Sequence, residues 1–183
     1  MQTKEFHGKQ ISRLGMDGLR FPHVPGKPNE IDREQGQIII DRAIQAGINY
    51  FDTTYTYQNG DSERFLGEAL SKYPRDSYYL ATKFYVAASD DIEAVFEEQL
   101  KRCQTDYFDF YLFHCLDETT IDAYMDPKKD YLGFLKKQKE LGRIRYIGFS
   151  SHAAPKTLER FLNWNDEFDM ALIQLNYVDW TLC

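Results

Sequence analysis

The chain has 183 residues, enough for one well-buried domain. Its net charge of -7 argues against a nucleic acid or an anionic membrane as partner, because both bind basic surfaces. Three widely spaced cysteines (Cys103, Cys115 and Cys183) favour free thiols in a reducing compartment. No apolar run approaches the roughly 18 residues of a membrane span, and the polar N-terminus is unlike a signal peptide. We therefore expect a cytoplasmic protein without a membrane partner.

The first predicted strand covers residues 11–15, followed by a loop rich in Pro, Gly and Asn. Residues 31–47 have the apolar spacing of an amphipathic helix, with Asp32 as N-cap and Gly47 as stop. A short β-favouring strand follows at 48–52. Strands then alternate with helices. The remaining predicted helices are 62–73 (capped at Asp61 or Ser62), 89–103, 130–142 and 154–164, and the remaining strands are 77–83, 108–114, 143–150 and 169–177.

The predicted strands are short and mostly apolar, and helices separate them along the chain. This pattern is typical of a parallel sheet covered by helices. Two architectures fit, a doubly wound sheet and a TIM barrel. A doubly wound sheet that binds a dinucleotide should show G-x-G-x-x-G after its first strand, which the segment from Gly15 to Gly18 does not match. The pattern of elements alone leaves both architectures open.

Polar residues stand at or just beyond the C-terminal ends of successive predicted strands. In a barrel these ends meet on one face, where active sites are built. Hydrogen-bonding or titratable groups on five strands in succession therefore favour the barrel and indicate a site. The residues are Asp52, Lys83, His114, Ser150, Gln174 and Asn176.

These residue types form a coherent set for reducing an aldehyde or a ketone. The reaction needs a hydride donor and an acid that protonates the oxygen as it gains negative charge. Tyr57 can be that acid, and the Lys83 ammonium is expected to lower its pKa from the usual value of about 10. Asp52 can hold the lysine in place. His114 can donate a hydrogen bond to the carbonyl oxygen.

The sequence around these residues resembles the aldo-keto reductase family. Residues 47–70, GINYFDTTYTYQNGDSERFLGEAL, closely match the signature G-x-N-x-F-D-T-A-x-x-Y-x-x-x-x-S-E-x-x-x-G. The segments ATK (81–83), YLFH (111–114), GRIRYIGFSSH (142–152) and IQLNYVDW (173–180) follow in the family's order. The resemblance covers essentially all of residues 10–180.

The resemblance implies a catalytic tetrad of Asp52, Tyr57, Lys83 and His114, with a small carbonyl compound as substrate. It also implies NADP(H), bound extended over the barrel mouth. Ser150 and Gln174 would hydrogen-bond the nicotinamide carboxamide. The further cofactor-binding residues that it implies are Ser151, Asn176, Gly18, Leu19 and Arg20.

The chain departs from the family pattern at two places. Thr54 stands where the signature has alanine, and Ser150-Ser151-His152 replaces the Ser-Asn of many members. The second departure resembles a branch that carries a C-terminal ferredoxin-like iron-sulfur region. Because this chain has no cysteine cluster, we expect no iron-sulfur cluster in it, and the spacing of its histidines predicts no metal site.

A closed (β/α)8 barrel needs eight strands, and this chain is expected to end just after the sixth. We therefore expect residues 1–183 to form a single domain, an incomplete TIM barrel. One hypothesis is that the chain is part of an NADP(H)-dependent reductase of aldehydes or ketones. The alternative is a non-enzymatic module that self-associates through its exposed barrel edges.

Overall fold

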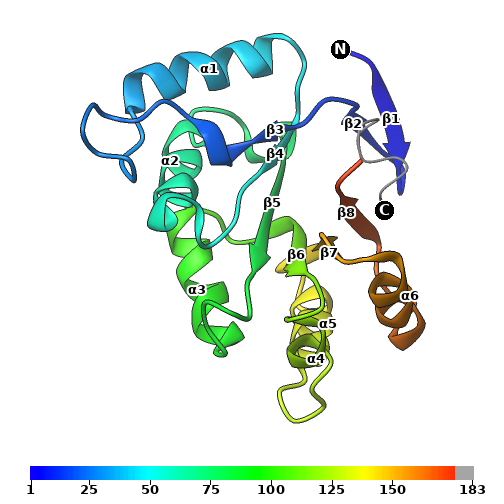
Figure 1. Ribbon diagram of the computed structural model, residues 1–183. Helices are drawn as coiled ribbons and strands as arrows, with labels where there is room; N and C mark the ends of the chain where they lie inside the picture. Colours follow the sequence, from blue (N-terminus) through cyan, green and yellow to red (C-terminus); the bar gives the residue numbers. More distant parts are fainter. Residues whose placement is uncertain (176–183) are drawn as a thin grey trace.

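The computed structural model describes residues 1–175 and contains one parallel sheet of six strands with its helices on the outside (Figure 1). The strands are neighbours in the sheet in the same order as in the chain. Their bounds are β3 Met16–Asp17, β4 Tyr50–Asp52, β5 Tyr79–Phe84, β6 Phe108–Leu116, β7 Ile144–Ser151 and β8 Met170–Ile173.

Helices separate the strands as predicted. They are α1 Arg33–Gln45, α2 Asp61–Leu70, α3 Ile92–Arg102, α5 Tyr131–Glu140 and α6 Pro155–Trp164. Shorter helical segments, which we did not predict, are η1 Gly18–Arg20, η2 Tyr57–Gly60, η3 Arg75–Ser77 and α4 Ile121–Tyr124. The predicted cap of α1 is confirmed, since the Asp32 carboxylate accepts the Gln35 amide at 3.0 Å. Within residues 1–175 no helix has both the length and the apolar character to cross a bilayer.

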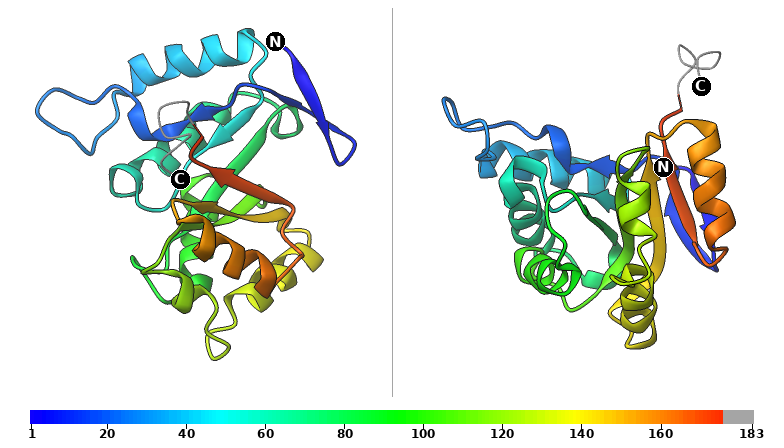
Figure 2. Two further views of the ribbon diagram at one scale, coloured as in Figure 1. Left: turned by 45° about the vertical axis from the view of Figure 1, so that its right-hand side comes forward. Right: turned by 60° about the horizontal axis from the view of Figure 1, so that its bottom comes forward.

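The strand order decides between the two architectures. In a doubly wound sheet the order reverses at a switch point, whereas here it runs without reversal. The sheet also curls, as Figure 2 shows. The Tyr50 hydroxyl of β4 lies 3.8 Å from the Met170 sulfur of β8, although three strands separate β4 from β8 in the sheet. The fold is an incomplete (β/α)8 barrel, and β3 and β8 are its two open edges among the described residues.

The first strand was placed wrongly by the sequence pattern. Of residues 11–15, predicted as a barrel strand, only Ile11 and Ser12 lie in a strand, and it belongs to an antiparallel hairpin of β1 (Thr3–Phe6) and β2 (Lys9–Ser12). The Phe6 ring packs against Tyr146 and Phe110, with centroid distances of 5.0 and 5.5 Å. The hairpin therefore contributes an aromatic side chain to the barrel interior. The true first barrel strand, β3, has only two residues and carries no periodicity to detect.

The predicted cap of α2 is also wrong. Its N-cap is Gly60, which has the left-handed φ of 82° that glycine adopts without strain. Asp61 instead accepts the Ile31 amide at 2.8 Å and pairs with Arg33. Ser62, the second residue of the helix, is fully buried. The polar side chains of Asp61 and Ser62 therefore serve contacts with other parts of the fold and do not cap the helix.

A buried carboxylate ties the strands together away from the predicted site. Asp109 on β6 has no solvent exposure and pairs with Arg75 at 2.8 Å and Arg145 at 2.6 Å. It also accepts the Leu80 amide of β5 at 2.9 Å. A buried charge is tolerated only when it is paired and hydrogen-bonded, which this arrangement provides. The carboxylate thereby links β5, β6 and β7.

We predict that Asp109→Ala lowers the free energy of unfolding by about 3 kcal/mol, because it removes a buried ion pair and leaves a buried amide without an acceptor. Urea unfolding followed by circular dichroism measures this value. Asp106→Ala is the matched control, since Asp106 is exposed and should change the value by less than about 0.5 kcal/mol. Equal effects of the two substitutions would contradict the prediction.

Candidate active site

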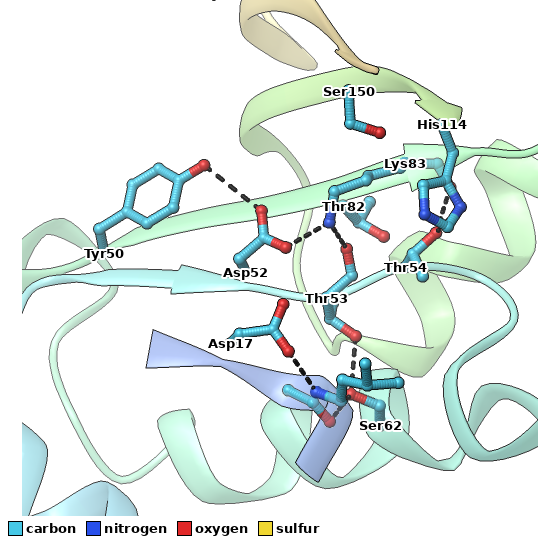
Figure 3. Close-up of polar contacts among 12 residues, drawn as sticks. Asp17, Tyr50, Asp52, Thr53, Thr54, Ser62, Thr82, Lys83, His114 and Ser150 are labelled. Atoms are coloured by element: carbon cyan, nitrogen blue, oxygen red, sulfur yellow. Dashed lines mark hydrogen bonds and ion pairs between the residues drawn. The ribbon is translucent and has the colours of Figure 1, made fainter. Parts of the chain in front are cut away.

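The structure brings the four predicted catalytic residues to one end of the barrel. Asp52 is the last residue of β4, Lys83 lies near the end of β5 and His114 lies near the end of β6, while Tyr57 begins η2 beyond β4. Figure 3 shows Asp52, Lys83 and His114 converging from neighbouring strands. They converge because adjacent parallel strands present their C-terminal ends at the same edge of the sheet.

The centre of the site is a buried ion pair. Lys83 is 1% exposed, and its ammonium contacts the Asp52 carboxylate and donates to the Thr53 carbonyl at 2.7 Å. Burial raises the pKa of the Asp52 carboxyl, and the Lys83 ammonium works against that shift. The Tyr50 hydroxyl approaches the same carboxylate at 3.4 Å. Each charge therefore depends on the other for its stability in the interior.

His114 is oriented by an irregularity in β6. The pairing of β6 with β7 shifts register between Phe113 and Leu116, and Cys115 has a left-handed φ of 56°. Such bulges redirect side chains at the ends of barrel strands. The imidazole Nδ1 lies 3.2 Å from the Thr54 hydroxyl oxygen. Burial, together with the charge of Lys83 and the nearby His152, lowers the pKa of His114 to about 3, so the ring is neutral at neutral pH.

Tyr57 packs edge-on against His114, with ring centroids 6.1 Å apart. The Lys83 nitrogen lies 5.6 Å from the centroid of the Tyr57 ring, and within residues 1–175 no hydrogen bond joins it to the phenol oxygen. The prediction that the pKa of Tyr57 lies below its usual value is wrong for this structure. Burial raises the pKa of Tyr57, and the carboxylates of Asp17 and Asp52 raise it further. The phenol keeps its proton at neutral pH.

A second buried network, which the sequence analysis missed, supports the segment that carries Tyr57. Glu63 on α2 is fully buried and accepts hydrogen bonds from Thr82 and Gln99, each at 2.7 Å. Its other oxygen pairs with Arg102 at 3.2 Å, and Arg102 also donates to the Tyr55 carbonyl at 3.2 Å. The network therefore anchors the chain two residues before Tyr57. The Ser-Glu pair of the signature was the available signal, but only its serine was interpreted, as a possible helix cap.

Ser62, the partner of Glu63 in that pair, connects three elements. Its hydroxyl donates to the Gly18 carbonyl at 3.0 Å and lies 2.8 Å from the Thr53 hydroxyl. A side chain at Gly18 would collide with Ser62 and approach the Asp52 carbonyl to 3.1 Å. The glycine therefore allows η1 to pack closely against α2 and the end of β4.

The predicted cofactor residues on β7 are both buried and engaged by the protein. The Ser150 hydroxyl accepts the Cys115 amide at 2.8 Å. The Ser151 hydroxyl donates to the Leu116 carbonyl at 3.1 Å and accepts the Ala153 amide at 3.0 Å. Both serines therefore hold the end of β7 against β6.

The other predicted cofactor residues lie after the ends of the two edge strands. Leu19 and Arg20 in η1 and Gln174 after β8 are exposed. The Leu19 backbone is fixed, since its amide donates to Asp17 at 2.7 Å and its carbonyl accepts from Gln58. Arg20 forms no ion pair with the described residues. Asn176 lies outside the described residues.

A cavity of about 710 Å³ opens inside the curved sheet. Its lining includes Asp17 and Asp52 from one side and Met170 and Leu172 from the other. Asp52 therefore lines this cavity as well as forming the ion pair. Across residues 1–175, no group of three or more His, Cys, Asp or Glu side chains is placed to hold a metal ion.

Comparison with known proteins identifies the family. The family model described as "Aldo/keto reductase family" matches residues 21–181 of this chain. The chain belongs to the aldo/keto reductase family. A probable aldo-keto reductase from Glycine max is 30% identical over 164 residues, which are 84% of this chain and 45% of that protein. The chain spans about half the length of the curated relatives that it matches, with 45% and 55% for two of them.

Solved structures give the same result for the fold. An aldo-keto reductase from Bacillus halodurans, described as a holo form, has a TM-score of 0.74 and 28% identity, covering 96% of this chain and 58% of that one. An aldo-keto reductase from Klebsiella pneumoniae, solved in complex with NADPH, has a TM-score of 0.76 at 22% identity, covering 99% and 62%. The incomplete barrel therefore corresponds to part of the complete family fold. The expected likeness to the branch with an iron-sulfur region stays a prediction.

The low pKa of His114 predicts an acid-dependent loss of stability. Between about pH 6.5 and 3 the unfolded chain binds a proton at this ring that the folded chain excludes, so its contribution is complete above about pH 6.5 and is lost as the pH falls. The difference in unfolding free energy between the wild type and His114→Gln should change by up to about 1.4 kcal/mol per pH unit in this window. Urea unfolding at pH values from about 7 to 4.5 measures it. A difference that stays constant over that range would contradict the prediction.

Proposed function

We propose that this chain forms the catalytic part of an NADP(H)-dependent reductase that converts aldehydes or ketones to alcohols. The observation that carries the proposal is the buried Lys83–Asp52 ion pair beside a protonated Tyr57 and a neutral His114, all at one end of the barrel. Membership of the aldo/keto reductase family supports it. The proposal applies to a protein in which this incomplete barrel is closed.

Each residue has a distinct role in the proposed reaction. Tyr57 donates its proton to the carbonyl oxygen as negative charge develops there. His114 donates a hydrogen bond to the same oxygen and orients the carbonyl. Lys83, held by Asp52 and the Thr53 carbonyl, supplies the positive charge that stabilises the phenolate left behind. The high pKa of the resting Tyr57 keeps the proton in place until that charge develops.

NADP(H) supplies the hydride when bound, and the residues present fit it in part. Arg20 is exposed after β3 without an ion pair to the described residues, so its charge is available for a phosphate of the cofactor. Gln174 is exposed after β8 and can hydrogen-bond a carboxamide. Ser150 and Ser151 lie at the C-terminal end of β7. The NADPH complex of the Klebsiella pneumoniae reductase supports this choice of cofactor.

Tyr57→Phe tests the proton donor. We expect it to lower the kcat of carbonyl reduction by at least about 100-fold, because general acid catalysis contributes about 10²- to 10⁴-fold. The Kd for NADPH should change less than about twofold, since the substitution removes one hydroxyl. NADPH oxidation at 340 nm and quenching of tryptophan fluorescence give the two values. Turnover at the wild-type rate would disprove the assignment of Tyr57.

The cofactor site of the 183-residue chain can be tested directly. If the described residues form only part of that site, titration with NADPH should give a Kd well above about 1 μM. Arg20→Ala should weaken that binding further, whereas Arg13→Ala, at an exposed arginine before η1, serves as the matched control. Submicromolar binding would show that residues 1–183 already contain the complete cofactor site.

The alternative function, a module that self-associates, has its own support in the structure. β8 is an edge strand of the described sheet, and Leu172, Ile173 and Leu175 at this edge are exposed apolar side chains. An unpaired apolar strand edge is a template for pairing with a second copy. If the 183-residue chain acts in this way, it forms dimers or larger assemblies through β8.

Ile173→Lys tests this alternative. A charge at the exposed edge should shift the chain toward monomer, which sedimentation velocity measures at several concentrations. Leu141→Lys is the control, since Leu141 is exposed at the C-cap of α5 and does not belong to an edge strand. A monomeric wild type, or equal effects of both substitutions, would contradict self-association through this strand.

A further inference from the structure

The Thr54 hydroxyl makes a contact in the candidate site that the proposed tetrad does not explain. Thr54 is fully buried, and its oxygen lies 3.2 Å from Nδ1 of His114 (Figure 3). The same oxygen lies 3.3 Å from the Lys83 carbonyl. The aldo-keto reductase signature has alanine at this position, which has no hydroxyl to make either contact. Thr54 therefore adds a polar partner to His114 that a chain with the usual signature residue lacks.

We propose that Thr54 is a positioning residue that fixes the tautomer of His114, with the proton on Nε2 and the Thr54 hydroxyl donating to Nδ1. A neutral imidazole carries one proton, and the partner of one nitrogen decides which nitrogen holds it. The proposal rests on the proposed carbonyl reduction for its functional meaning. It extends that function, because it specifies how His114 becomes a donor toward the substrate.

The hydroxyl proton of Thr54 has two possible acceptors, and their other partners distinguish them. The Lys83 carbonyl already accepts the Gln99 amide at 3.0 Å. The Thr54 oxygen lies at nearly the same distance from the Lys83 carbonyl, 3.3 Å, and from Nδ1, 3.2 Å. Nδ1 has no partner but Thr54 among the described residues. Donation of the proton to Nδ1 therefore gives a hydrogen bond to the acceptor that has no other partner.

The consequence appears at the opposite nitrogen. No described residue forms a hydrogen bond with Nε2. This nitrogen is also not one of the buried side-chain atoms left without a partner, so it is open to a ligand. With Nδ1 accepting from Thr54, Nε2 carries the N–H and can donate to a carbonyl oxygen. In the opposite tautomer Nε2 would present a lone pair, which repels that oxygen.

The backbone of His114 is held by a separate contact. The Tyr124 hydroxyl donates to the His114 carbonyl at 2.6 Å and does not touch the imidazole nitrogens. The Tyr57 and Tyr85 rings meet the imidazole edge-on, at centroid distances of 6.1 and 5.2 Å. These contacts restrict the position of the ring without choosing between tautomers. Among the described residues, that choice rests with Thr54.

The test is ¹⁵N NMR of histidine-labelled protein at about pH 7, with the His114 signals assigned by their loss in His114→Gln. In the wild type, Nε2 should have the shift of a protonated nitrogen and Nδ1 that of an unprotonated one. Thr54→Val removes the hydroxyl and keeps the shape, so both nitrogens should move toward the average of the two tautomers. Thr54→Ser should restore the wild-type shifts. Thr56→Val, at an exposed threonine of the same loop, should leave them unchanged.

A wild type with the proton on Nδ1 would overturn the proposal, as would a Thr54→Val protein with wild-type shifts. The first outcome does not depend on Thr54→Val, so the proposal stays falsifiable even if that variant fails to fold. In the reductase, Thr54→Val should also lower kcat/KM about fivefold, the effect of weakening one hydrogen bond. A lack of turnover in every form would contradict the proposed reduction, whereas the NMR shifts alone decide the tautomer.

Discussion

The candidate site depends on keeping one positive charge in the interior of the barrel. Lys83 is almost completely buried, so its ammonium is stable only while Asp52 and the Thr53 carbonyl remain beside it. Both partners come from the end of β4, whose Asp52 pairs in register with Ala81 of β5. A slip of one residue would turn Lys83 toward the helices and leave both charges unpaired. The ion pair therefore fixes the alignment of β4 and β5.

The candidate site and the buried network around Glu63 lie on opposite faces of β5. Successive side chains of a strand point to opposite faces, so Lys83 faces the barrel interior and Thr82 faces the helices. Thr82 joins Glu63 and Gln99 in the outer buried network, and Gln99 also donates to the Lys83 carbonyl at 3.0 Å. A change in the outer network therefore reaches the lysine through one hydrogen bond. The packing of α2 and α3 and the geometry of the site are coupled in this way.

The sequence predicted the features that follow from local pattern and missed those that depend on distant partners. The strand ends carrying Asp52 and His114 were predictable, because an apolar run followed by a polar residue is a local signal. Glu63 was missed because polar residues are also common at the start of a helix, and its partners Gln99 and Arg102 are far along the chain. The position of the Lys83 ammonium relative to the Tyr57 ring requires coordinates, so the sign of the Tyr57 pKa shift was beyond the pattern.

Burial shifts the pKa values of Tyr57 and His114 in opposite directions, and both shifts favour the neutral side chain. It raises the pKa of the phenol and lowers that of the imidazole to about 3, so both groups are neutral donors at neutral pH. The charges nearby are the Lys83–Asp52 pair and the Asp17 carboxylate, which caps η1. Such a site forms only ordinary neutral hydrogen bonds with an uncharged carbonyl in its ground state. In the proposed reduction, hydrogen bonds from these donors would strengthen as the carbonyl oxygen becomes negative, and such a difference in binding accelerates a reaction.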